Sequence, residues 1–167
     1  ERRVRELTDA GLAPVECWCT PDTGHRLFRA LEREYGVRLR VQPGGDLGAR
    51  MQTAAAGALQ QGEIVLLIGV DCPALTPNHL ARALSWLDQG ADAVLGPAED
   101  GGYVLLGLRR PAPAVFAEMP WGSERVLALT RERMARLDWD WRELETLWDL
   151  DRPPDYERLM AGDWVPD

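Results

Sequence analysis

The sequence predicts an α/β protein, a three-layer sandwich with a mostly parallel sheet. Short segments with strand-like patterns alternate along the chain with longer segments of helical period, which is typical of a parallel sheet covered by helices. The run Ile64–Ile68 contains no polar residue, which favours a strand buried on both faces in the middle of such a sheet. No internal repeat, linker or low-complexity segment interrupts the pattern, so we predict a single domain over residues 1–167.

Glycines end the two helices expected in the first third of the chain. Residues 1–10 have a helical pattern that stops at Gly11, and the apolar residues of 27–35 recur at helical spacing until Gly36. Apolar and polar residues alternate in the segments that follow these helices, which predicts strands. The expected elements are a helix over residues 1–10, a strand over 14–20, a helix over 27–35, a strand over 37–41 and an alanine-rich helix over 49–60.

The apolar run Ile64–Ile68 leads directly to a carboxylate, Asp71. Pro73 then ends the strand pairing because proline has no N–H to donate. Thr76 has the character of a helix N-cap and Pro77 suits the first helical position, so a helix is expected to start there. In open α/β sheets, ligands bind outside the carboxyl ends of the strands, and the sequence places Asp71 at such an end.

Two later strands, over residues 91–96 and 103–108, are too close in sequence for a helical crossover. They are therefore expected to form a hairpin or an excursion from the sheet. Ser123 has the character of the N-cap of the next helix. The remaining expected elements are a helical turn over residues 112–117, a helix after Ser123, a last strand from about residue 139 and a terminal helix that begins near residue 153.

The composition excludes several classes of function. Nineteen basic residues against 27 acidic ones give 19 − 27 = −8, and such a chain repels nucleic-acid phosphates, so we expect no nucleic-acid partner. It lacks a clustered basic face for a membrane surface, and no window approaches the roughly 18 apolar residues of a spanning helix. Cys17, Cys19 and Cys72 have no metal-ligand spacing, so we expect reduced cysteines in a cytoplasmic protein.

Acidic residues lie at or just beyond the ends of predicted strands in three places. They are Asp71, the pair Glu99 and Asp100, and Asp149 with Asp151. Because the carboxyl ends of parallel strands meet at one edge of a sheet, these acids are expected to converge on one cleft. Carboxylate oxygens suit Mg²⁺ or Mn²⁺, which take one or two protein carboxylates plus substrate phosphates. An acid in a turn is more often a cap or a solvated side chain, and that alternative stays open.

A glycine-rich turn precedes the alanine-rich helix. It comprises Gly44, Gly45, Asp46 and Gly48, and Arg50 follows one turn into the helix. Backbone N–H groups at a helix N-terminus are the ingredients of an anion site, so the turn is a candidate contact for a nucleotide or phosphate. It is neither a phosphate-loop signature nor G-x-G-x-x-G. A tight turn with Gly48 allowing close packing, and an exposed Arg50, is the competing interpretation.

The loop between the two later strands carries two acids and two glycines, Glu99, Asp100, Gly101 and Gly102. Glycines allow the backbone to approach a ligand or to adopt positive φ, and the carboxylates are able to accept hydrogen bonds from hydroxyls. A plain hairpin turn needs only one acid and one glycine. We therefore expect this loop to contact a substrate, with Asp100 as the better candidate for a catalytic base.

Trp121, Gly122 and Ser123 place a large aromatic ring on a loop. Such an arrangement is common where a side chain stacks on a sugar or a base, so these residues are candidate substrate contacts. Packing of Trp121 in the core is the alternative. No Ser-His-Asp or Cys-His arrangement is evident, which argues against a hydrolase triad.

Five motifs follow one another along most of the chain. They are Gly44-Gly45-Asp46-Leu47-Gly48-x-Arg50-Met51, Gly69-Val70-Asp71-Cys72-Pro73-x-Leu75-Thr76, Gly96-Pro97-Ala98-Glu99-Asp100-Gly101-Gly102-Tyr103, Pro120-Trp121-Gly122-Ser123 and Asp149-Leu150-Asp151-x-Pro153. Together they resemble a bacterial family of nucleotide-diphospho-sugar-transferase-like proteins. Members are commonly described as family A glycosyltransferases, some of them associated with arsenosugar biosynthesis. The wider superfamily includes the molybdenum-cofactor and phosphoenolpyruvate-type nucleotidyltransferases.

This resemblance implies a site around two aspartates. In the relatives, an Asp-x-Pro after the fourth strand and a later aspartate hold the divalent metal on the nucleotide, and the matching positions are Asp71 and Asp151. The second motif departs from the family pattern at two positions, where this chain reads Asp151-Arg152-Pro153-Pro154-Asp155, but it keeps the aspartate.

The resemblance also implies that the chain lacks the first strand of the family. That strand carries a Lys-Thr-Arg-Leu segment that contacts the nucleotide, and it normally lies between the strands assigned here to residues 15–19 and 64–69. We therefore expect an N-terminally truncated form, with the gap closed by repacking or by a partner chain. A homodimer is one option.

The predicted function is a metal-dependent transferase that uses an activated nucleotide. Glycosyl transfer from a nucleotide-diphospho-sugar to a small acceptor is the first choice on resemblance. The alternatives are a nucleotidyltransferase that uses a nucleoside triphosphate and releases pyrophosphate, and a non-catalytic fragment or binding module that keeps the fold. Asp71 and Asp100 are the catalytic candidates, and Asp71 with Asp151 are the candidate ligands of Mg²⁺ or Mn²⁺.

Overall fold

A computed structural model describes residues 1–62 and 64–162. The chain divides into two compact units, residues 1–46 and the chain from Leu47 onward, and each is described by itself. Glu63, which precedes the apolar run in the sequence, lies outside the described residues. The prediction of one domain stays a prediction.

The first unit is a two-stranded parallel sheet with two helices. Its elements are α1 (Arg2–Ala10), β1 (Glu16–Cys19), α2 (Arg26–Tyr35) and β2 (Arg38–Val41). Strand β1 pairs with β2 in parallel, and Cys17 lies opposite Leu39. Val4 from α1 and Leu31 from α2 pack with Val37 in a small core. The helices and strands predicted for this part of the chain are confirmed, with bounds shifted by a few residues.

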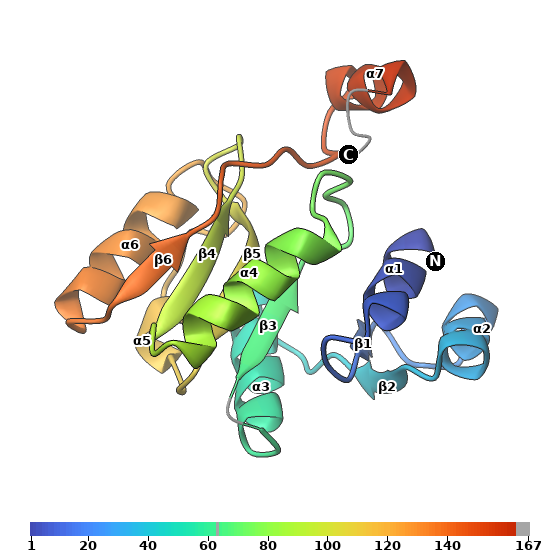
Figure 1. Cartoon of the computed structure of the whole chain (residues 1–167), viewed down its shortest axis with the longest axis horizontal. Coiled ribbons are helices and arrows are strands. Elements are labelled where there is room, and N and C mark those ends of the chain that lie inside the picture. Colours follow the sequence, from blue (N-terminus) through green and yellow to red (C-terminus); the bar gives the residue numbers. More distant parts are fainter. Residues whose placement is uncertain (63, 163–167) are drawn as a thin grey trace. The chain divides into compact units, whose positions relative to one another are not determined.

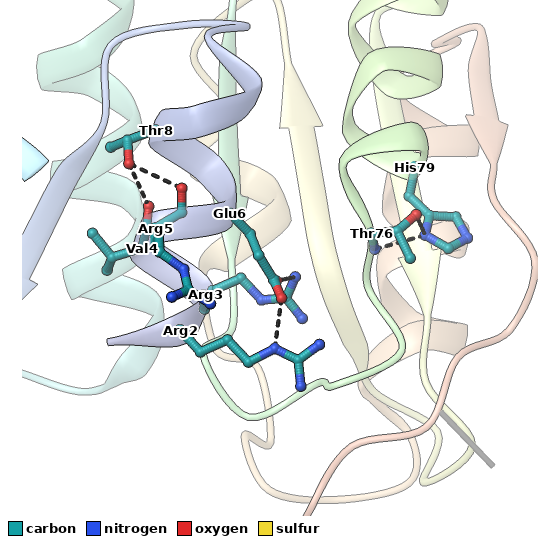
Figure 2. Close-up of polar contacts among 8 residues, drawn as sticks. All are labelled: Arg2, Arg3, Val4, Arg5, Glu6, Thr8, Thr76 and His79. Atoms are coloured by element: carbon teal, nitrogen blue, oxygen red, sulfur yellow. Dashed lines mark hydrogen bonds and ion pairs between the residues drawn. The ribbon is translucent and has the colours of Figure 1, made fainter. Parts of the chain in front are cut away.

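Local chemistry ends and braces the helices of this unit. Gly11 caps α1 in the left-handed conformation at φ 61°, where glycine carries no steric cost. Figure 2 shows Arg2 and Arg3 of α1 turned toward Glu6, at 2.6 and 3.0 Å. Such exposed pairs one helical turn apart contribute only a few tenths of a kcal/mol each, about 0.2–0.5, to helix stability.

The second unit contains a four-stranded mixed sheet in the order β3-β5-β4-β6. Its elements are α3 (Leu47–Leu59), β3 (Val65–Ile68), α4 (Pro77–Asp88), β4 (Ala93–Pro97), β5 (Tyr103–Leu108), α5 (Pro113–Phe116), α6 (Val126–Arg136), β6 (Trp141–Glu143) and α7 (Pro153–Ala161). Strand β5 is antiparallel to both β3 and β4, whereas β6 is parallel to β4. Strands β3, β4 and β6 therefore run in one direction, and the predicted hairpin is confirmed as β4–β5.

Helices cover both faces of this sheet, which confirms the three-layer sandwich. On one face, Leu95 of β4 and Leu106 of β5 join a core cluster with Val115 of α5 and Met134 of α6. On the other face lies α4, which crosses the sheet in Figure 1. Gly107 makes room for this helix, because a Cβ there would come within 2.9 Å of a methyl group of Leu87.

Two expectations about this unit are wrong. Strand β3 is not buried on both faces in the middle of the sheet, since it lies at one end of the strand order and all four of its residues are half-buried. The fully buried strand is β4, because the hairpin inserts β5 between it and β3. Ser123 is not the N-cap of the following helix, because α6 starts at Val126 after Arg125 and the Ser123 hydroxyl donates to the carbonyl oxygen of Pro120.

None of the helices in the described part of the chain is long and apolar enough to cross a membrane. Cys17, Cys19 and Cys72 form no disulfide within the described residues. Burial raises the pKa of both Cys17 and Cys19 above the ordinary thiol value, which keeps them in the unreactive protonated form.

Candidate active site

Three acid-bearing segments meet at the carboxyl edge of the four-stranded sheet. Asp71 follows β3, Asp100 lies in the turn between β4 and β5, and Asp149 with Asp151 follow β6 and the stretch beyond it. Because β3, β4 and β6 run in one direction, their carboxyl ends lie at the same edge. The expected convergence of these acids therefore has a structural basis within one unit.

Backbone hydrogen bonds join the segment after β6 to the end of β4. The N–H of Leu147 donates to the carbonyl oxygen of Pro97 at 2.9 Å, and the N–H of Glu99 donates to that of Leu147 at 3.0 Å. An isolated parallel bridge between Ala98 and Leu147 continues the pairing of β4 with β6. These contacts place Asp149 beside the turn that carries Asp100.

A second set of contacts joins the same segment to the loop after β3. The N–H of Leu150 donates to the carbonyl oxygen of Asp71 at 2.9 Å. The thiol of Cys72, which is fully buried, donates to the carbonyl oxygen of Trp148 at 3.2 Å. Cys72 is therefore a packing residue that connects two acid-bearing segments.

The side chains of Asp100, Asp149 and Asp151 form an acid cluster. One carboxylate oxygen from each lies within 4.8 Å of the others, and Asp149 is half-buried between two exposed partners. Burial and the neighbouring charges of Asp100, Asp151 and Asp71 raise the pKa of Asp149 to about 6. The neighbouring negative charges disfavour the ionised form of Asp149, and a bound cation would relieve that repulsion.

Asp71 lies next to this cluster without being one of its three members. Its carboxylate contributes to the raised pKa of Asp149, so it acts on the same site. The side chain turns back over its own loop, since a Cβ on Gly69 would lie 2.8 Å from an Asp71 carboxylate oxygen. The predicted metal pair of Asp71 and Asp151 stays a prediction, and Asp149 lies close to Asp151.

The turn from Glu99 to Gly102 has internal reasons for its residues. Gly101 has φ 88°, and a Cβ there would lie 2.3 Å from the carbonyl oxygen of Glu124. The N–H of Gly102 donates to a carboxylate oxygen of Asp100 at 2.7 Å, which fixes that side chain in the turn. Close packing against Glu124, in the turn before α6, thus accounts for Gly101, and contact of these residues with a substrate stays a prediction.

Trp121 lies at the boundary of the core rather than freely on the surface. Its ring lies edge-on to that of Tyr103, with 6.5 Å between the ring centroids. Its buried Nε1 has no hydrogen-bond partner among the described residues. A Cβ on Gly48 would lie 2.7 Å from that nitrogen. This geometry favours the packing interpretation for both Trp121 and Gly48. In the turn that follows, Gly122 is exposed and Ser123 is half-buried.

The glycine-rich turn falls on the boundary between the two units. Gly44, Gly45 and Asp46 belong to the first unit, and Gly48 and Arg50 lie in the first turns of α3 in the second. Gly45 has φ 106°, a conformation that favours glycine. The proposed contact of this turn with a nucleotide stays a prediction.

His79 connects α4 to the segment that follows β6. Figure 2 shows its Nδ1 facing Thr76, whose backbone N–H donates to it at 2.9 Å. The neutral tautomer therefore carries its proton on Nε2, which lies 2.8 Å from a carboxylate oxygen of Glu145. Arg82 also pairs with Glu145. Sequence patterns do not predict this contact, because its partners are 66 residues apart.

Residues 3–123 match a family model described as an uncharacterized protein conserved in bacteria, DUF2064. The chain belongs to this family. No curated protein matches the chain in sequence.

Solved structures with a similar fold include a candidate nucleotide-diphospho-sugar transferase from Desulfovibrio desulfuricans G20. It is 30% identical with a TM-score of 0.81, over 96% of this chain and 74% of that one. The fold of nucleotide-diphospho-sugar transferases, and the resemblance that the motifs predict, are thereby confirmed.

Two more distant structures share the fold alone. One is CMP:2-keto-3-deoxy-manno-octonic acid synthetase in complex with CTP, 12% identical with a TM-score of 0.60 over 96% of this chain and 88% of that one. The other is glucosyl-3-phosphoglycerate synthase from Mycobacterium tuberculosis with phosphoglyceric acid, 14% identical with a TM-score of 0.58 over 98% and 76%.

Proposed function

We propose that this DUF2064 chain is a metal-dependent transferase that acts on an activated nucleotide. Glycosyl transfer from a nucleotide-diphospho-sugar to a small acceptor is the preferred reaction. The observation that carries the proposal is the convergence of Asp100, Asp149 and Asp151 at the carboxyl edge of the sheet, where ligands bind in open α/β folds. The 30% identical relative, itself a candidate nucleotide-diphospho-sugar transferase, supports the choice of substrate class.

The acid cluster suits a hard divalent cation. Its donors are carboxylate oxygens only, the ligand type that Mg²⁺ and Mn²⁺ prefer. Burial and repulsion by the neighbouring carboxylates both raise the pKa of Asp149, and a bound cation would relieve the repulsion. Asp149 and Asp151 would hold the ion, with Asp71 or Asp100 beside them. When bound, it would offset the negative charge that builds on a diphosphate leaving group.

The remaining carboxylates have roles that follow from their positions. Asp100 is held in its turn by the N–H of Gly102, which fixes one of its oxygens. In the proposed reaction it would take the proton from the acceptor hydroxyl as that oxygen bonds to the anomeric carbon of the sugar, while the bond from that carbon to the diphosphate breaks and a nucleoside diphosphate leaves. Asp71, joined to Leu150 through its backbone carbonyl, keeps the loop after β3 beside the site.

Binding and product analysis test the proposal. Nucleotide sugars and nucleoside triphosphates are screened by thermal shift with and without Mn²⁺, and the products of any ligand that binds are identified. We expect Mn²⁺-dependent stabilisation and release of a nucleoside diphosphate. Release of pyrophosphate would instead identify nucleotidyl transfer.

A charge-matched pair of variants serves as the control. Asp149→Asn should abolish the Mn²⁺-dependent shift, whereas Asp88→Asn, at the far end of α4, should retain it. A wild-type chain that shows no shift with any nucleotide plus Mn²⁺ would overturn the proposal and favour a binding module or an inactive fragment.

A further inference from the structure

Arg158 of α7 lies between two of the acid-bearing segments. A single guanidinium nitrogen, Nη1, donates to both carboxylate oxygens of Glu99, each at 3.2 Å. The guanidinium also stacks on the ring of Trp148, with 4.7 Å from its Cζ to the ring centroid. Glu99 immediately precedes Asp100, and Trp148 immediately precedes Asp149. The guanidinium is thus attached to the neighbours of two members of the acid cluster.

Arg158 stacks on a buried ring, that of Trp148, but pairs with an exposed carboxylate, that of Glu99. Trp148 is buried, with 4% of its surface exposed, and its carbonyl oxygen accepts a hydrogen bond from the Cys72 thiol. Its ring is therefore held in place, and the guanidinium stacks on it. The side chain of Glu99 is 55% exposed and that of Arg158 is 39% exposed. An ion pair this accessible contributes little to stability, so another anion is able to displace Glu99.

The Glu99 carboxylate occupies a position on Arg158 that a phosphate group could take. A carboxylate and a phosphate both present two oxygens to the guanidinium fork, and arginine recognises both through parallel hydrogen bonds. The surrounding carboxylates, by contrast, repel a substrate diphosphate. The positively charged guanidinium of Arg158, stacked on Trp148 beside these carboxylates, would attract the diphosphate.

We propose that Arg158 binds a phosphate oxygen of the substrate diphosphate and that Glu99 occupies the guanidinium until substrate arrives. This inference rests on the proposed function, because it assigns a binding residue for the same activated nucleotide. Helix α7 then has a role in substrate binding although none of its residues is buried. Glu99 acts as a competitor of the substrate rather than as its ligand.

Opposite responses of two variants test the proposal. Inorganic pyrophosphate, with and without Mn²⁺, is titrated into the wild-type chain and into Glu99→Gln and Arg158→Gln by calorimetry. Loss of a charge-assisted bidentate contact should weaken pyrophosphate binding about tenfold or more in Arg158→Gln. Removal of the competing carboxylate should strengthen it in Glu99→Gln, by roughly threefold for a pair worth well under 1 kcal/mol.

If the contact between Arg158 and Glu99 only stabilises the fold, a different result is expected. Both variants would then lower the melting temperature, and pyrophosphate affinity would be unchanged or would fall in both, which overturns the proposal. Arg158→Lys keeps the positive charge but lacks the paired N–H donors of a guanidinium, so it should bind pyrophosphate with intermediate affinity. Titration of Mn²⁺ alone tests the acid cluster separately, so failure of the proposed function and failure of the Arg158 assignment give distinct results.

Discussion

The backbone N–H of Leu150 donates a hydrogen bond to the carbonyl oxygen of Asp71, at 2.9 Å, and so joins the loop after β3 to the segment after β6. The buried thiol of Cys72 makes a second connection, to Trp148. Main-chain groups therefore set the separation of the acid-bearing segments. Substitution of an aspartate side chain should leave that separation in place, so its effect reports on charge and ligand binding.

Asp149→Asn should stabilise the metal-free protein while abolishing its response to Mn²⁺. The substitution removes a half-buried carboxylate that three other aspartates repel. A gain of about 1 kcal/mol, limited by solvent screening, corresponds to roughly 2–4 °C in melting temperature for a chain of this size. Thermal unfolding with and without Mn²⁺ measures both effects. A variant that is less stable than wild type without metal would contradict the repulsion argument.

The metal-free protein should lose stability as the pH rises from about 4 to about 6. The pKa of Asp149 is raised to about 6 in the folded chain, against about 3.9 for an unfolded aspartate. The folded state therefore binds the proton more tightly, and this contribution is present below pH 4 and is lost as the pH passes through 6. Denaturant unfolding of wild type and Asp149→Asn across this range isolates the contribution, which should be absent from the variant.

The apparent affinity for Mn²⁺ should rise over the same range. A cation competes with the proton on Asp149, so binding releases protons below about pH 6 and becomes independent of this group above about pH 7. Calorimetry in two buffers of different ionisation enthalpy measures the protons released. Equal Mn²⁺ affinity at pH 5 and pH 7 would show that Asp149 is not a ligand.

The elements of this fold were predictable from local patterns, whereas the position of its central strand was not. Gly11 and Gly36 end helices where expected, and the hairpin follows from the short connection between its strands. Periodicity cannot reveal strand order, however. The apolar run at Val65–Ile68 suggests a central strand, yet the hairpin takes the central place and leaves β3 at the end of the sheet.

The candidate site was predictable to a similar depth. Acids beyond strand ends predict that these carboxylates meet at one edge of the sheet, because chain direction alone brings those ends together. The proximity of Asp149 to Asp100 and Asp151 depends on the bridge of Leu147 to Ala98, which no sequence pattern predicts. Sequence patterns do not predict the contact of Arg158 with Glu99 either, because the two residues are 59 positions apart.

The contact between His79 and Glu145 should couple α4 to the segment after β6. The Nε2–carboxylate distance of 2.8 Å is that of a hydrogen bond, and His79 is largely buried whereas Glu145 is half-exposed. A double-mutant cycle of His79→Ala and Glu145→Ala should give a coupling energy of about 0.5–1 kcal/mol in denaturant unfolding. Arg82→Ala serves as a control for the second partner of Glu145. Additive single substitutions would mean that the contact contributes nothing.

Gly48→Ala and Gly57→Ala should change stability in opposite directions. Both add one methyl group to α3, but at Gly48 it would meet Trp121 Nε1 at 2.7 Å and the carbonyl oxygen of Phe116 at 2.9 Å, whereas nothing lies within 4 Å at Gly57. Overpacking should cost about 1–3 kcal/mol in Gly48→Ala. Gly57→Ala should gain roughly 0.5–1 kcal/mol, because alanine loses less conformational entropy than glycine in a helix.

Chemical denaturation of the two variants, followed by nucleotide titration, separates packing from ligand contact at Gly48. A packing role predicts lower stability with little change in nucleotide affinity at a temperature where the variant remains folded. If Gly48→Ala instead keeps the stability of wild type and loses nucleotide binding, the glycine serves the ligand. Because Gly57→Ala carries the same added methyl in the same helix, any difference between the variants arises from what surrounds Gly48.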